Sequence, residues 1–350
     1  MAKNDKDYAV VVGIKTYPAF DKDGPLEGPE NDARAVYDWL TSTVGGNLPK
    51  GNVTLIVSSD YDPPATEPSD ARPMIVDVQK AFEVLQDKAE ENARNMKGLQ
   101  VGRRLYIYMA GHGFAPRDDQ TALLLANATS KRTGAAYHVL GQYTANWFFK
   151  AKYFEEIILL MDCCRENQLH MGLNMSFGEI SAPGAVNKVK RFYGYGTKWS
   201  RLSREKDIDG IRRGVFTHAL IKGLAGGAVN PDTGELTARS LSDYLYTVME
   251  KVDVTEGPEI EFHPKNGKGF VLMTMPVPEF KVTLHVPPSS IGKAAQIIDG
   301  GTLEEVKSIP AVTEPWVVDL KRGKYLALIP ADSKRLVIVV EGTGDVNESF

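Results

Sequence analysis

The chain has very few cysteines, and the two that it has cannot cross-link a fold. Cys163 and Cys164 are the only cysteines among 350 residues, and because they are adjacent they form no long-range disulfide. This usage excludes a disulfide-rich secreted scaffold and fits a reducing cytoplasm. The N-terminal residues Met1–Asp7 also lack the apolar stretch and cleavage site of a secretory signal. We therefore expect a soluble cytoplasmic protein.

Long hydrophobic runs and an excess of charge of one sign are missing as well. The longest apolar stretches, such as Tyr8–Ile14, are far shorter than the roughly 18 residues that a membrane helix needs. The formal net charge is −4 at pH 7, from 41 basic and 45 acidic residues. This balance gives no basic surface of the kind that binds nucleic acid or anionic lipid. We expect neither nucleic acid nor membrane among the partners.

Short apolar runs alternate with segments of helical periodicity over the first 275 residues. The continuous β-rich runs Tyr8–Ile14, Leu105–Ala110 and Ile157–Met161 are typical of strands buried on both faces of a parallel sheet. Between them apolar residues recur at helical spacing, for example Val36 and Leu40. The alternation predicts an α/β fold with a mostly parallel central sheet covered by helices on both faces.

The composition changes at Met275–Pro278. Beyond this point Val282 and Leu284 alternate with polar residues, which is the pattern of a half-buried strand. Further strand candidates follow, separated by glycine and proline turns: Trp316–Leu320, Tyr325–Ile329 and Leu336–Val340. We therefore expect an α/β domain over residues 5–275 and a small C-terminal all-β module, similar to a β-sandwich, over residues 277–350.

A histidine and a cysteine each follow a predicted buried strand. His112 lies between two glycines after Leu105–Ala110, and Cys164 follows Ile157–Met161 behind Asp162. Ligands of open α/β sheets bind beyond the carboxyl ends of the strands, so neighbouring strands would bring the imidazole and the thiol to one edge. A histidine that deprotonates a thiol makes it a nucleophile. The alternatives are a structural histidine and a cysteine that packs as a small apolar residue.

Several motifs occur in a fixed order along residues 8–225, and together they resemble one enzyme clan. They are Gly13-Ile14 with Tyr17, Leu26 with Gly28, Asn31-Asp32-Ala33, Gly111-His112-Gly113, Asp162-Cys163-Cys164, and Gly214-Val215-Phe216-Thr217 with Ala219-Leu220. This set resembles the caspase and metacaspase clan of cysteine peptidases (peptidase C14-like), and the metacaspases and bacterial relatives more than animal caspases. The resemblance implies a caspase-like three-layer sandwich and a cysteine endopeptidase with a Cys-His dyad.

The resemblance assigns roles to residues at the predicted sheet edge. The family pattern Asp-x-Cys implies that Cys164 is the nucleophile, and that His112 is the general base and acid. Cys163 then occupies the variable position, where we interpret it as a packing residue. In the family, backbone N–H groups form the oxyanion site, and the resemblance assigns this role to the N–H groups of Gly113 and Cys164.

Substrate preference is also implied by the resemblance. Metacaspases place two carboxylates in the pocket for the residue before the scissile bond, and the matching residues are Asp32 and Asp162. Such a pair binds Arg or Lys through charge-assisted hydrogen bonds and repels an acidic side chain. Asp32 by itself would equally fit a residue that interacts with a helix N-terminal dipole.

The segment of residues 185–210 is rich in basic side chains. In the clan this segment links the two halves of the catalytic domain, so an enzyme specific for Arg or Lys would cut itself here; the alternative is a solvated loop. The basic residues of this segment are Lys188, Lys190, Arg191, Lys198, Arg201, Arg204 and Lys206.

We expect no cofactor and no metal. Calcium activation occurs in the family, but it is not predicted here, because Asp118-Asp119 is only a weak match to an acidic loop.

The predicted function is a cysteine endopeptidase that cleaves proteins after Arg or Lys, processes itself and acts in a bacterial stress or defence pathway. The expected partners are protein substrates and a regulatory partner of the C-terminal β module. Two alternatives stay open. One is a catalytically silent caspase-like scaffold or regulatory binding protein. The other is a doubly wound nucleotide-binding regulator.

Overall fold

The computed structural model describes residues 3–21, 24–117, 120–129, 137–165, 178, 189–198, 205–252, 257–341 and 345–350. Its contacts divide the chain into two units. The first comprises Met1–Ala228 and Leu236–Met273, and the second comprises Val229–Glu235 and Thr274–Phe350. Residues 229–235 therefore group with the C-terminal residues, although the composition change at Met275–Pro278 gives no sign of this.

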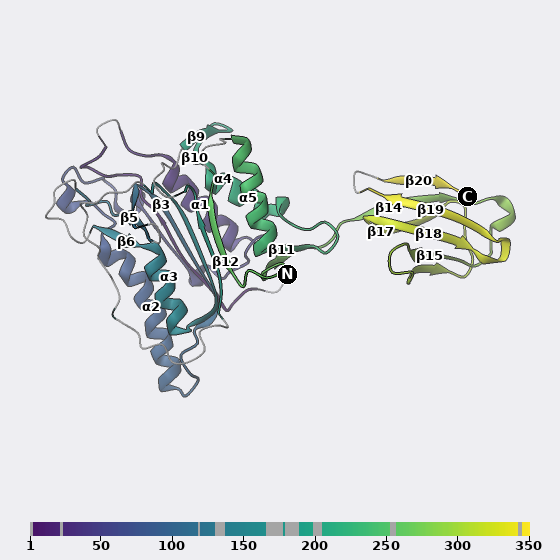
Figure 1. Ribbon diagram of the computed structural model, residues 1–350, viewed down its shortest axis with the longest axis horizontal. Helices are drawn as coiled ribbons and strands as arrows, with labels where there is room; N and C mark the ends of the chain where they lie inside the picture. Colours follow the sequence, from purple (N-terminus) through teal and green to yellow (C-terminus); the bar gives the residue numbers. More distant parts are fainter. Residues whose placement is uncertain are drawn as a thin grey trace. The chain divides into compact units, whose positions relative to one another are not determined.

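A six-stranded sheet forms the centre of the first unit (Figure 1). Its order is β12-β8-β7-β3-β1-β2, with every neighbouring pair parallel except β12 and β8. The mostly parallel sheet predicted from the apolar runs is thus confirmed. The strands are β1 (Asp7–Gly13), β2 (Val53–Val57), β3 (Gly102–Gly111), β7 (Phe154–Cys163), β8 (Lys190–Tyr195) and β12 (Glu259–His263).

Helices cover both faces of this sheet, which explains why its inner strands are apolar on both sides (Figure 1). On one face Phe82 and Phe148 join a core cluster with Met109. On the other face Leu220 lies beside Tyr108 among side chains of three helices. The first face carries α2 (Ile75–Arg94) and α3 (Gly141–Ala151), and the second carries α1 (Gly28–Thr41), α4 (Val215–Lys222) and α5 (Ala238–Val252).

Three smaller sheets lie outside the central sheet in this part of the described chain. β4 (Gly113–Arg117), β5 (Gln120–Leu124) and β6 (His138–Leu140) form one sheet, and β9 (Glu205–Ile208) pairs with β10 (Ile211–Gly214). β13 (Val271–Thr274) pairs with β11 (Glu235–Thr237) and not with the central sheet. The central sheet contains β8 and β12, neither of which was predicted.

The second unit is all-β, as expected. Its two sheets have the orders β17-β14-β20 and β16-β15-β18-β19. Val282, Trp316 and Ile338 belong to one buried cluster that draws on both sheets. The strands are β14 (Glu279–His285), β15 (Ala295–Asp299), β16 (Glu305–Ile309), β17 (Trp316–Lys321), β18 (Gly323–Ile329), β19 (Lys334–Val340) and β20 (Val346–Ser349).

A buried ion pair joins the two central strands β3 and β7. Arg104 is only 1% exposed, and its Nε donates to Glu156 Oε2 at 2.6 Å. The other guanidinium nitrogens donate to the Tyr106 hydroxyl at 2.9 Å and to the carbonyl oxygens of Leu272 and Val271 at 2.6 and 3.2 Å. Because these partners satisfy the guanidinium, the charge is tolerated in the core as long as Glu156 balances it.

Replacing Glu156 should therefore destabilise the first unit. We expect Glu156→Gln to lower its free energy of unfolding by about 3 kcal/mol, since removing one partner of a buried pair leaves the other charge uncompensated. Circular dichroism at 222 nm during urea unfolding reports this unit, because all five described α-helices belong to it. The control Glu155→Gln changes an exposed neighbour and should cost less than about 0.5 kcal/mol. Equal stability of the two variants would contradict the assignment.

Candidate active site

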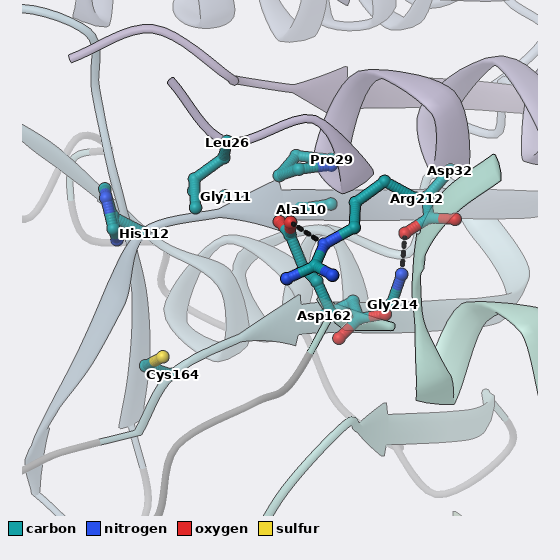
Figure 2. Close-up of a pocket in the computed structure, with 11 residues that line it drawn as sticks. Leu26, Pro29, Asp32, Ala110, Gly111, His112, Asp162, Cys164, Arg212 and Gly214 are labelled. Carbon is teal, nitrogen blue, oxygen red and sulfur yellow. Dashed lines mark hydrogen bonds and ion pairs between the residues drawn. The ribbon is translucent and has the colours of Figure 1, made fainter. Parts of the chain in front are cut away.

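The register of β3 and β7 brings the predicted histidine and cysteine to one edge of the sheet. Ala110 pairs with Asp162 and Gly111 pairs with Cys163, so His112 and Cys164 are the next residues along two adjacent parallel strands. Both side chains line a pocket of about 330 Å³ beyond the strand ends (Figure 2). Asp32 and Asp162 line the same pocket. The structure thus gathers all four of these predicted side chains.

The two cysteines have different surroundings. Cys163 is 1% exposed within the core cluster, and burial raises the pKa of its thiol well above the ordinary value. Cys164 is partly exposed and lines the pocket. The backbone of Gly113 lies against Cys163, because a Cβ on this glycine would stand 2.8 Å from the Cys163 Sγ. Gly113 therefore has to be a glycine, and of the two thiols it is Cys164 that reaches the pocket.

The environment of His112 favours its neutral form. Its side chain is partly exposed, and burial of the rest lowers the pKa of the imidazole below the ordinary value. The charge of Asp21 acts in the opposite direction and raises this pKa. A neutral imidazole is the form that accepts a proton, so His112 can serve as a base near neutral pH.

Two buried carboxylates form the wall of the pocket. Asp32 Oδ2 accepts a hydrogen bond from the backbone N–H of Gly214 at 2.6 Å. Asp162 Oδ2 accepts from the backbone N–H and the hydroxyl of Thr217 at 3.1 and 2.7 Å. Burial and then the charge of Asp162 raise the pKa of Asp32 to about 8. Because Asp32 Oδ1 is buried without a hydrogen-bond partner in the described chain, this wall suits a cationic ligand.

Gly214 is the position that lets these carboxylates converge. A Cβ there would stand 2.1 Å from Asp162 Oδ2 and 2.9 Å from Asp32 Oδ2. Any side chain would therefore displace one carboxylate or the hairpin strand β10 that ends at this residue. The motif that begins at Gly214 thus supplies a backbone N–H to one aspartate and, through Thr217, two donors to the other.

A third carboxylate in the pocket, Glu205, was not predicted. It lies at the start of β9, and its carboxylate accepts a hydrogen bond from the backbone N–H of Gly28. Burial and the charge of Asp162 raise its pKa. On the paired strand β10, Arg212 Nε lies 3.6 Å from Glu205 Oε2. Both residues belong to a highly charged stretch of sequence, where nothing marks one carboxylate as different from its neighbours.

The basic segment is not one continuous linker. Lys190 and Arg191 belong to β8, inside the central sheet, where Lys190 Nζ lies 3.0 Å from Glu156 and the Arg191 guanidinium lies 4.3 Å from the centre of the Phe149 ring. The expectation of a linker or solvated loop is therefore wrong for these two residues. Lys206 belongs to β9, and Lys198 is exposed beyond β8. The remaining basic residues, Lys188, Arg201 and Arg204, lie outside the described residues.

The described residues contain no group of three or more His, Cys, Asp or Glu side chains arranged to hold a metal ion. Asp118 and Asp119, the weak match to a calcium loop, lie outside the described residues. Among the helices that the structure describes, none combines the length and apolar character needed to cross a bilayer.

Comparison with known proteins identifies the family. A probable protease of a Desulfuromonadales bacterium is 24% identical over 350 residues; the match covers 91% of this chain but only 40% of that protein, so the chain spans less than half of its relative. The structure is also similar to caspase-1 from Spodoptera frugiperda, with a TM-score of 0.45 and 12% identity over 75% of this chain and 88% of the other. The sequence profile of the caspase domain, peptidase family C14, matches residues 6–268, and the chain therefore belongs to this family.

Proposed function

We propose that this chain is a cysteine endopeptidase in which Cys164 is the nucleophile and His112 is the general base and acid. The observation that carries the proposal is the pocket at the ends of β3 and β7, which both side chains line beside three carboxylates. The partial exposure of Cys164 and the lowered pKa of His112 support these roles. Membership of the caspase-domain family supports the same class of reaction.

The reaction would proceed through an acyl-enzyme. His112 takes the thiol proton of Cys164, and the sulfur attacks the carbonyl carbon of the scissile peptide. The backbone N–H groups of Gly113 and Cys164 are assigned to the negative oxygen of the tetrahedral intermediate. The imidazolium then gives its proton to the leaving amine as the C–N bond breaks, which leaves a thioester. Water, deprotonated by His112, attacks the thioester and releases the acid and the free thiol.

The charge of the pocket supports cleavage after Arg or Lys. Asp32, Asp162 and Glu205 lie on three different elements and line the same pocket as Cys164. A guanidinium or ammonium group would form charge-assisted hydrogen bonds with them, whereas an acidic side chain would meet like charges. The ion pair of Glu205 with Arg212, whose side chain is 47% exposed, indicates that this pocket already accepts a guanidinium at its rim.

Peptide hydrolysis tests this function directly. In fluorogenic peptides that differ only in the residue before the cut, we expect turnover with Arg and Lys and none with Asp. Hydrolysis should be lost in Cys164→Ala and fall about 10²- to 10⁴-fold in His112→Ala, since that is the usual contribution of a general base. Cys163→Ala is the matched control and should retain activity. A preference for Asp, or activity that survives in Cys164→Ala, would contradict the proposal.

Removing one carboxylate of the pocket should weaken selection for Arg. We expect Asp162→Asn to lower kcat/KM for the Arg peptide about 10- to 100-fold, because a hydrogen bond to a charged group contributes about 1.5–3 kcal/mol. The control Glu27→Gln removes one negative charge from an exposed residue just before α1. If both variants lose activity equally, the effect comes from net charge rather than from the pocket.

Binding of a guanidine that cannot be cleaved should depend on pH. In Cys164→Ala we expect the Kd of agmatine to fall as the pH rises from 6 to about 8, by at most about tenfold per pH unit. The reason is that Asp32, whose pKa is about 8 in the empty pocket, must lose its proton before it can pair with the ligand. Isothermal titration calorimetry measures both the Kd and the released proton. Asp32→Asn keeps Asp162, Glu205 and His112, and it should flatten the dependence; an unchanged slope would count against this reading.

The same specificity leads us to infer self-cleavage within residues 185–210. Lys198 is exposed beyond β8, whereas Lys190 and Arg191 are held in the sheet, so we place the cut outside β8. During incubation the intact band of the wild type should decline while that of Cys164→Ala persists. Equal persistence of the two bands would refute self-cleavage. A role in bacterial stress or defence, and a regulatory partner of the β module, stay predictions.

A further inference from the structure

A tyrosine hydroxyl is inserted into the backbone pairing at His112. On the antiparallel strands β4 and β5, Gly113 pairs with Leu123. The preceding residue His112 is therefore opposite Leu124, whose N–H donates to the His112 carbonyl oxygen at 2.8 Å. In a hydrogen-bonded antiparallel pair the two residues exchange both of their N–H···O bonds. Here the second bond runs through Tyr17, because its hydroxyl accepts the His112 N–H at 3.0 Å and donates to the Leu124 carbonyl oxygen at 3.1 Å.

The hydroxyl of Tyr17 is itself held in one place. Tyr17 is fully buried, in the loop between β1 and α1. The Asp21 carboxylate accepts the Tyr17 N–H at 2.6 Å, and the N–H groups of Phe20 and Asp21 donate to the Tyr17 carbonyl oxygen at 2.8 and 2.9 Å. Burial also raises the pKa of the hydroxyl well above its ordinary value, so the group keeps its proton and remains a donor. A fixed bridge of this kind confines the backbone of His112.

The ring of Tyr17 contacts the imidazole of the same histidine. The two ring centres are 4.7 Å apart, and the ring planes are inclined at 59°. Gly111, the last residue of β3, leaves room for the hydroxyl, because a Cβ there would stand 2.3 Å from the Tyr17 oxygen. Its φ of +149° also favours glycine. One buried side chain thus meets His112 at its backbone and at its ring, and the reaction steps proposed for Cys164 use neither contact.

We propose that Tyr17 is a positioning residue that sets the place and orientation of the His112 imidazole relative to the Cys164 thiol. This inference rests on the proposed function, and Tyr17 acts in it only through His112. The need for such a residue follows from the fold, since His112 lies between the end of β3 and the start of β4 and belongs to neither strand. A base works only within hydrogen-bond reach of the proton that it takes, and a displacement of about 1 Å can cost about 100-fold in rate.

Tyr17→Phe tests the hydroxyl, because phenylalanine keeps the ring. Tyr193→Phe is the matched control: Tyr193 is a buried tyrosine of the same core cluster, and its hydroxyl donates to Asn146 Oδ1 at 3.0 Å. Each variant loses one hydrogen-bonded hydroxyl, so we expect similar decreases in Tm. At a temperature where circular dichroism at 222 nm shows both variants folded, kcat for the Arg peptide should fall about 10- to 100-fold in Tyr17→Phe alone, with KM unchanged. Equal kcat values in the two variants would overturn the inference, since the hydroxyl would then be only structural.

Alkylation of the thiol tests the same arrangement without a peptide. In the Cys163→Ala background Cys164 is the only thiol, and its rate of reaction with iodoacetamide at pH 7 reports how far His112 activates it. We expect Tyr17→Phe to lose most of the difference in rate between this parent and His112→Ala, and Tyr193→Phe to react like the parent. A parental rate in Tyr17→Phe would overturn the inference alone. Equal rates in the parent and in His112→Ala would instead overturn the proposed function.

Discussion

The geometry of the candidate site depends on the register in which β3 and β7 pair. A shift of one residue would turn every side chain of one strand to the opposite face, because successive residues of a strand alternate. Arg104 and Glu156 are direct partners in this register, so their buried ion pair fits only the observed alignment. The same alignment, six residues further along, places Ala110 opposite Asp162. The ion pair near the start of these two strands and the pocket beyond their other end therefore share one constraint.

The alternation along β7 also explains why the aspartate and the thiol are two residues apart. Met161 and Cys163 belong to the core cluster on the face covered by α2 and α3. Leu160 lies on the other face with α1 and α4, and Asp162 follows it there, where it meets Thr217. Cys164 is the first residue beyond the strand, at the rim of the pocket. A spacing of two is thus the one that gives a pocket carboxylate and an accessible thiol at the same strand end.

Features that depend on local pattern could be predicted from the sequence. The sequences of β1, β3 and β7 are continuous apolar runs, because these strands are buried on both faces. The sequences of α1 and α2 show apolar residues at helical spacing. The edge strand β12 carries charged residues and leaves no such run. Glu205 could not be found in this way, because pairing with β10 and a hydrogen bond from Asn31 to the Arg212 carbonyl oxygen, 181 residues away, bring its hairpin to the pocket.

When no ligand is bound, repulsion between the carboxylates of the pocket destabilises the folded protein. This repulsion also bears on the proposed selectivity of the pocket. The pKa of Asp32, raised from 3.8 to about 8, means that the folded chain holds this proton more tightly than the unfolded chain does. Its contribution to the free energy of unfolding therefore falls as the pH rises through that interval. The Gly214 N–H and the Thr217 donors offset only part of the repulsion between the two aspartates. A cationic ligand would relieve what remains, so the charge conflict that costs stability is also the one on which the proposed preference for Arg over Asp depends.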